Sequence, residues 1–169
     1  LDLVQAFGRA MTSVAAEHRP ILLMAGDGDL KPQVEAAIAT LKLSDSIRLL
    51  GFQSQQRLAA LYDLCDVFVL PSAHETWGLV VNEVMNAGKP VIASDRVGAA
   101  RDLVQEGVNG FIYPSGDPGA RAARRLEATP APTRLAAMGV ESRRIIDGWG
   151  FAQNLAGLKA ALAATVGAR

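Results

Sequence analysis

The sequence predicts an α/β protein in which a doubly wound parallel sheet is followed by a helical carboxy-terminal tail. Short apolar segments alternate with segments of helical periodicity as far as residue 113, which is typical of strand–helix–strand units. Hydrophobic residues make up 50% of the 169 residues but aromatic residues only 5%, so small aliphatic side chains must build the core. From Asp117 onward Ala and Arg dominate and no strand is indicated. We therefore expect one domain, with an α/β core at 1–116 and a helical tail at 117–169.

Each element is predicted from its own local pattern. Five short apolar segments indicate strands at 20–25, 46–51, 66–70, 90–94 and 110–113. The first is a continuous apolar run, which is typical of a strand buried on both faces of a parallel sheet. Apolar residues at helical spacing indicate helices at 1–11, 30–41, 54–64, 79–87, 99–106, 117–128, 133–147 and 151–166. Ser54 and Asp117 are candidate N-caps, and Gly88 and Pro90 end the helix at 79–87.

Composition and charge exclude several classes of function. A net charge of zero gives no electrostatic reason to expect nucleic acid or an anionic membrane as a partner. The single cysteine, Cys65, excludes an internal disulfide and a multi-cysteine metal site, and we expect a core thiol there. Neither His18 nor His74 has partners at metal-ligand spacing, so no metal is expected. No apolar stretch is long enough to span a bilayer and no signal peptide opens the chain, which favours a cytoplasmic protein.

Other candidate motifs are incomplete. Gly26-Asp-Gly28 lacks the third glycine of a dinucleotide fingerprint, and neither a P-loop nor a Gly-x-Ser-x-Gly elbow is present. The tail could offer an arginine patch to an acidic partner, but interleaved acidic residues favour a solvated helix face. The arginines are Arg121, Arg124, Arg125, Arg134, Arg143 and Arg144, and the acidic residues are Glu127, Glu141 and Asp147.

The helix at 79–87 carries the main candidate site. It is apolar nearly all round, so we expect it to be buried, with Glu83 on the same face as Leu79, Val80, Val84 and Ala87. A carboxylate there needs a partner, because an uncompensated buried charge is costly. Glu75 lies in the loop just before the helix, whose unpaired N–H groups and dipole suit a phosphate that Gly78 lets approach. In the alternative interpretation, Glu83 is a structural carboxylate paired with an arginine and Glu75 is a capping residue.

The residues around this helix resemble a known signature. The pattern Pro-Ser-x-x-Glu-x-Trp-Gly-Leu-Val-x-x-Glu-x-Met-x-Ala-Gly-x-Pro-Val-Ile-Ala, at 71–93, is similar to that of the family 4 retaining glycosyltransferases, which have the GT-B fold. The resemblance continues through Ala25-Gly-Asp-Gly28 and Asn109-Gly-Phe-Ile-Tyr-Pro114. It covers essentially the whole chain, as the Rossmann-like carboxy-terminal half that binds the nucleotide-sugar donor in this family.

The resemblance implies a role for each matching position. Glu75 would contact the donor sugar near the reacting centre, and Glu83 would accept hydrogen bonds from the ribose hydroxyls. The diphosphate would be held by backbone N–H groups of Gly78, Leu79 and Val80. Other candidates near the base or the sugar are Phe52, Arg57, His74, Thr76 and Trp77. For His74, a substrate or supporting contact and a plain exposed loop residue stay equal alternatives.

The sequence also departs from the family pattern. Members open this half with a strand and a loop that carries an Arg and a Lys-Gly pair, whereas this chain starts after that place, and the acceptor domain is absent. We therefore expect no transferase activity from the chain alone. The absent strand would lie between 20–25 and 66–70: these strands could pair directly, another chain could supply a strand, or the sequence is a fragment, which we favour. Arg101 stands where many relatives have Pro, which leaves donor contacts at 97–100 uncertain.

The resemblance implies the donor-binding domain of a retaining glycosyltransferase. It would move a sugar from a nucleotide-diphosphate-sugar to an unidentified acceptor, in polysaccharide or glycolipid biosynthesis, with neither cofactor nor metal. The acceptor sugar or lipid would be bound through the absent domain, which could also hold the protein peripherally at the inner membrane. Two alternatives stay open: another GT-B enzyme, such as a nucleotide-sugar epimerase or a starch- or sucrose-type synthase, and a non-catalytic nucleotide-binding or interaction module. Oligomeric state is not predicted.

Overall fold

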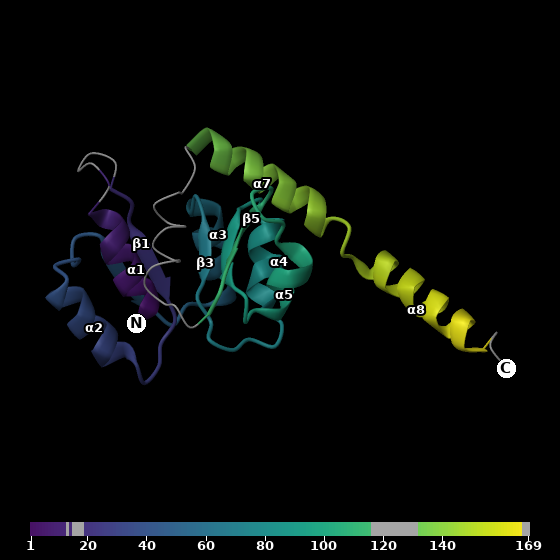
Figure 1. The fold of residues 1–169 in the computed structure, drawn as a ribbon, viewed down its shortest axis with the longest axis horizontal. Coiled ribbons are helices and arrows are strands. Elements are labelled where there is room, and N and C mark those ends of the chain that lie inside the picture. The colour runs from purple at the N-terminus through teal and green to yellow at the C-terminus, as the bar shows by residue number, and fades with distance from the viewer. Residues whose placement is uncertain (13, 15–18, 116–131, 167–169) are drawn as a thin grey trace.

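The computed structural model describes residues 1–12, 14, 19–115 and 132–166 (Figure 1). Seven helices lie in these ranges: α1 (Asp2–Met11), α2 (Lys31–Thr40), α3 (Gln55–Leu64), α4 (Leu79–Asn86), α5 (Gly98–Leu103), α7 (Pro132–Ile146) and α8 (Phe151–Val166). The strands are β1 (Leu22–Ala25), β2 (Ile47–Gly51), β3 (Phe68–Leu70), β4 (Val91–Ser94) and β5 (Gly110–Tyr113). The helix predicted at 117–128 with its Asp117 cap, His18, Arg121, Arg124, Arg125 and Glu127 lie outside the described residues.

The five strands form two parallel sheets. β1 pairs with β2, and β3, β4 and β5 pair in that order. Every pairing joins strands that a helix connects along the chain, so the predicted α/β fold with parallel strands is confirmed. Within the described residues no ladder joins β1 to β3, so direct pairing of these strands is excluded.

Helix α1 connects the two sheets through its apolar sides. Val4, Phe7 and Met11 pack with residues of α2, β2 and the turn before β2. Ala6 packs instead with Ile92 of β4 and with Tyr113 of β5. Because these residues all lie in the first three turns of one helix, α1 holds both sheets on the same rigid element.

The prediction that strand 20–25 is buried on both faces is wrong. Leu22 and Met24 pack towards α1 and α2, but Leu23 is 36% exposed and Ile21 just before β1 is 62% exposed. The register places Leu23 beside Arg48 of β2 on the same open face. Among the described residues, α1 and α2 both pack on one face of the sheet of β1 and β2, and no described helix covers the face that carries Leu23.

The largest core cluster surrounds α4. Its Val81, Val84 and Met85 are fully buried against β4, α5 and α7. Helix α7 approaches so closely that a Cβ on Gly139 would lie 2.1 Å from the carbonyl oxygen of Gly88, which follows α4. The Arg143 side chain also donates to the Asn86 carbonyl at 2.9 Å. The first helix of the described tail is thus packed on the α/β core.

The outer surface of α7 and helix α8 are exposed. Arg143 pairs with Asp147 and Arg144 with Glu141, all partly exposed, so the predicted solvated face is confirmed for these residues. Helix α8 extends away from the rest of the molecule (Figure 1), and its Phe151 is 94% exposed. Among the described helices, none has both the length and the apolar character needed to cross a membrane.

Candidate functional site

Helix α4 begins at a glycine in the left-handed region. Gly78 is the N-cap with a φ of 89°, which side chains rarely adopt, and no side chain caps the helix. Across the described part of the chain, the backbone N–H groups of Gly78, Leu79 and Val80 donate to no acceptor. Together with the helix dipole, these donors form a terminus that favours an anion. The alternative that Glu75 caps the helix is wrong, because its carboxylate accepts from the Trp77 N–H, one residue before the N-cap.

Glu75 is fixed by its backbone to the loop after β4. Its N–H donates to the Arg96 carbonyl at 3.0 Å, and its carbonyl accepts from the Gly98 N–H at 3.0 Å. This pairing forms an isolated parallel bridge between Glu75 and Val97. Glu75 is half-buried, and its carboxylate Oε1 accepts from the Trp77 backbone N–H at 3.4 Å. Glu75 thus lies on a hydrogen-bonded turn close to the amino terminus of α4.

Glu83 has a partner that the sequence analysis does not name. The Tyr62 hydroxyl donates to Glu83 Oε2 at 2.9 Å, so the predicted need for a partner is confirmed, whereas the alternative of an arginine is wrong. Burial and the hydrogen bond to Glu83 raise the pKa of Tyr62 to about 12. Both residues line a groove of about 320 Å³ between α3 and α4, together with Gln55, Ala59 and Ala87. The signal that could have found Tyr62 is a hydroxyl within an otherwise apolar stretch of helix 54–64.

The prediction that α4 is buried nearly all round is wrong at its first turn. Leu79 is 70% exposed, and Glu83 and Val80 are half-buried. The fully buried face is the one that meets β4 and α7. Leu79 lies on the side of α4 opposite to Val81, Val84 and Met85, so its side chain meets solvent rather than the core.

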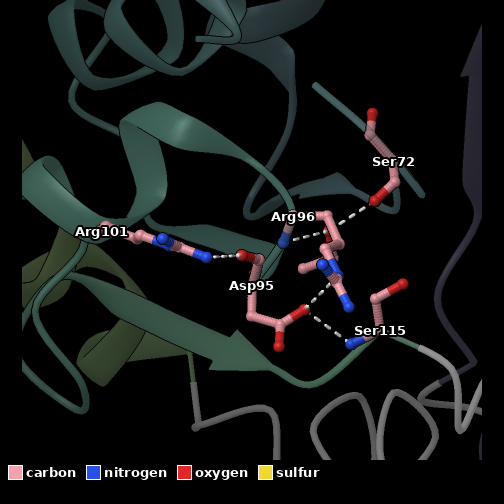
Figure 2. Close-up of polar contacts among 6 residues, drawn as sticks. Ser72, Asp95, Arg96, Arg101 and Ser115 are labelled. Atoms are coloured by element: carbon pink, nitrogen blue, oxygen red, sulfur yellow. Dashed lines mark hydrogen bonds and ion pairs between the residues drawn. The ribbon is translucent and has the colours of Figure 1, made fainter. Parts of the chain in front are cut away.

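Ser94 and Asp95 together link the loops that follow β3, β4 and β5 (Figure 2). The Asp95 Oδ1 accepts from the Ser115 N–H at 2.8 Å, and the Arg96 guanidinium lies 3.8 Å from the same oxygen. Next to it, the Ser94 hydroxyl donates to the Ser72 carbonyl after β3. Arg101 donates to the Asp95 carbonyl at 3.2 Å. These contacts join three strand ends around the Glu75 turn, and the sequence pattern did not single out Asp95 because the contact to Ser115 spans twenty residues.

The remaining candidates are placed as follows. The Trp77 indole donates to Asn82 Oδ1 at 2.9 Å and lies 6.0 Å from the Trp149 ring, which follows α7. Phe52 is 84% exposed in the loop after β2. Side chains of three further candidates are exposed: Arg57, His74 and Thr76. The structure thus brings Glu75, Gly78 and the start of α4 together, and leaves Phe52 and Arg57 on a different loop and helix.

Two other features lie away from this site. A cavity of about 620 Å³ between α7 and the amino ends of β3 and β4 contains none of the candidate residues. Cys65, on the wall of this cavity, is half-buried. Its Sγ donates to the Tyr62 carbonyl, and burial raises the pKa of this thiol.

Two further expectations concern a helix cap and a metal site. Ser54 stands at the N-cap of α3 as predicted, but its side chain makes no capping bond. In the described ranges, no group of three His, Cys, Asp or Glu side chains is placed to hold a metal.

Comparison with known proteins shows the family to which the chain belongs. A model of the glycosyl transferases group 1 matches residues 3–139. A D-inositol 3-phosphate glycosyltransferase of Thermobispora bispora is 35% identical over 134 residues, which are 79% of this chain and 31% of that protein. An uncharacterized glycosyltransferase of Methanocaldococcus jannaschii is 36% identical over 107 residues, 63% of this chain and 27% of that protein.

A solved structure shows the same fold. The crystal structure of the pneumococcal O-GlcNAc transferase GtfA, in complex with UDP and GlcNAc, matches with a TM-score of 0.78 at 23% identity. The match covers 98% of this chain and 33% of that one. The chain therefore spans about a third, or less, of the length of these three proteins.

The parallel α/β fold, with a helix terminus beside Glu75, defines a Rossmann-like domain of the GT-B glycosyltransferase class. Within that class, the chain belongs to the group 1 glycosyl transferases, a family of enzymes, since the family model covers most of its residues.

Proposed function

We propose that this chain binds the nucleotide-diphosphate-sugar donor of a retaining glycosyltransferase. The observation that carries the proposal is the start of α4, where three backbone N–H groups without a described acceptor lie beside the Glu75 turn. A diphosphate is the anion that such a terminus suits best, and a carboxylate next to it can act on the sugar that the diphosphate leaves. We propose that no metal takes part, because the helix terminus and cationic side chains would together take up the negative charge of the diphosphate.

Each part of the donor has a proposed contact. The diphosphate accepts hydrogen bonds from the N–H groups of Gly78, Leu79 and Val80. The ribose hydroxyls donate to Glu83, which lines the groove between α3 and α4. The sugar lies at Glu75, within reach of the loop that holds His74, Thr76 and Trp77. The base lies at the loop after β2, where Phe52 offers backbone groups and Arg57 stands in the first turn of α3.

The relatives support this assignment and suggest which donor to test first. The pneumococcal relative was solved with UDP and GlcNAc, which supports a uridine nucleotide as the donor. The bacterial relatives include an amylovoran biosynthesis glycosyltransferase of Erwinia amylovora, which supports a role in polysaccharide or glycolipid assembly. In this proposal, protein outside this chain binds the acceptor.

Titration calorimetry with UDP and GDP tests the proposal directly. We expect saturable binding of one of them, and a weaker affinity in Glu83→Gln, because ribose hydroxyls prefer an ionised acceptor. Glu35→Gln is the matched control, since Glu35 is an exposed helical glutamate of α2. A folded protein that binds neither nucleotide would contradict the proposal and favour an interaction module.

A further inference from the structure

Tyr62 is held in one place by the core. Its side chain is buried, with the residue 7% exposed, and its ring meets the Phe68 ring edge to face, with centroids 6.2 Å apart. Tyr62 lies on α3 whereas Phe68 lies on β3, so two elements fix the ring. The hydroxyl therefore has little freedom, and it points to Glu83 on a third element, α4.

The hydrogen bond between Tyr62 and Glu83 has only one possible direction. An ionised carboxylate accepts and cannot donate, so the phenol donates to Oε2. The raised pKa of Tyr62, about 12, keeps the phenol protonated throughout the neutral range. Among the described residues, no second donor reaches the Glu83 carboxylate. One of its oxygens is thus engaged while the other is left for a ligand.

The geometry points to Tyr62 as a positioning residue that sets the orientation of the Glu83 carboxylate for the hydroxyls of the bound nucleotide. This inference rests on the proposed function. Both residues line the groove between α3 and α4, which Gln55 in the first turn of α3 also lines. The Glu83 side chain has several rotatable bonds. Without the hydrogen bond from the phenol, it would lose its rotamer freedom only when the nucleotide binds, and this loss would lower the affinity. Tyr62 instead holds the carboxylate in place before the ligand arrives.

Tyr62→Phe tests this inference because it removes the hydroxyl and keeps the ring. Binding of UDP and of 2′,3′-dideoxy-UDP, which lacks the ribose hydroxyls, is measured by calorimetry. We expect UDP affinity to fall about three- to tenfold, the range for loss of one typical hydrogen bond, because the phenol acts on the nucleotide only through the carboxylate that it holds. Affinity for the dideoxy nucleotide is expected to stay unchanged. In a Glu83→Gln background, Tyr62→Phe is expected to have no further effect on UDP affinity.

Tyr113→Phe is the matched control, since Tyr113 is the other buried tyrosine but lies on β5, away from the groove. Its affinity for UDP should equal that of the wild type. An equal loss for both nucleotides in Tyr62→Phe, or a loss that persists in the Glu83→Gln background, would show a merely structural role and overturn the inference. An unchanged UDP affinity in Tyr62→Phe would also overturn the inference, provided that Glu83→Gln binds UDP weakly. A wild-type protein that binds no nucleotide would overturn the proposed function, and this inference with it.

Discussion

Glu75 and Val97 form a parallel backbone bridge, although they follow different strands. The Glu75 N–H donates to the Arg96 carbonyl and the Glu75 carbonyl accepts from the Gly98 N–H, so the two hydrogen bonds, both 3.0 Å long, lie on either side of Val97. The side chain of Glu75 is thereby carried on the edge formed by the loops after β3 and β4. A group that must meet a reacting sugar benefits from such a fixed backbone, because a small misplacement lowers the rate strongly.

The first prediction concerns the carboxylate on this bridge. In a form of the protein with measurable sugar transfer, Glu75→Gln should lower kcat far more than it weakens UDP binding. The amide keeps the size of the side chain but loses the charge that acts in the transition state. Steady-state kinetics and calorimetry on the same variant measure both effects. Wild-type kcat in Glu75→Gln would exclude Glu75 from the reaction.

The second prediction concerns the backbone approach at Gly98. A Cβ at this position would lie 2.1 Å from the Thr76 carbonyl oxygen, so Gly98→Ala must push the two loops apart. We expect a loss of about 1–3 kcal/mol in the free energy of unfolding, as in other overpacked sites. Urea unfolding measures this loss. The control is Gly28→Ala, where no atom lies within 4 Å of the added Cβ; equal stability of the two variants would contradict the prediction.

The third prediction concerns Asp95, which accepts from the Ser115 N–H. Asp95→Ala leaves this N–H without its partner, and we expect a loss of about 1 kcal/mol in unfolding free energy. Asp95→Asn retains an oxygen in place and should lose less. The ion pair with Arg96 adds little, because both side chains are largely exposed. Thermal unfolding compares these variants with Asp102→Ala, an exposed aspartate of α5. A loss in Asp102→Ala as large as in Asp95→Ala would argue against the contact.

The fourth prediction concerns stability at high pH. Burial raises the pKa of both tyrosines of the chain, Tyr62 and Tyr113, to about 12 from 10.0. Below pH 10 both are protonated in the folded and unfolded states, and their contribution is fully present. As pH rises through 10 to 12 the unfolded chain loses these protons first, so stability falls.

Urea unfolding between pH 8 and pH 12 measures this fall. The double variant Tyr62→Phe/Tyr113→Phe lacks both groups, so its stability should decline less steeply above pH 10. Between pH 8 and 9 the two proteins should show the same pH dependence, which serves as the internal control. Parallel curves across the whole range would mean that other groups cause the alkaline loss.

The sequence by itself determined the order of the elements and most of their bounds. The predicted strand 110–113 and helix 151–166 coincide with β5 and α8, and Gly88, at a φ of 67°, follows the end of α4. These features depend on local causes: the spacing of apolar residues, and glycine or proline at element ends. The candidate glutamates and Gly78 were likewise visible, because the motif that holds them is continuous in the chain.

Only the tertiary structure decided which faces are covered and which side chains meet. The open face of β1 follows from α1 and α2 lying on one side of its sheet, which no property of the strand itself reveals. The partner of Glu83 is 21 residues away on α3, and the partner of the Asp95 carboxylate is 20 residues away after β5. Such contacts depend on how whole elements pack, because packing rather than local periodicity sets the distance between residues that are remote along the chain.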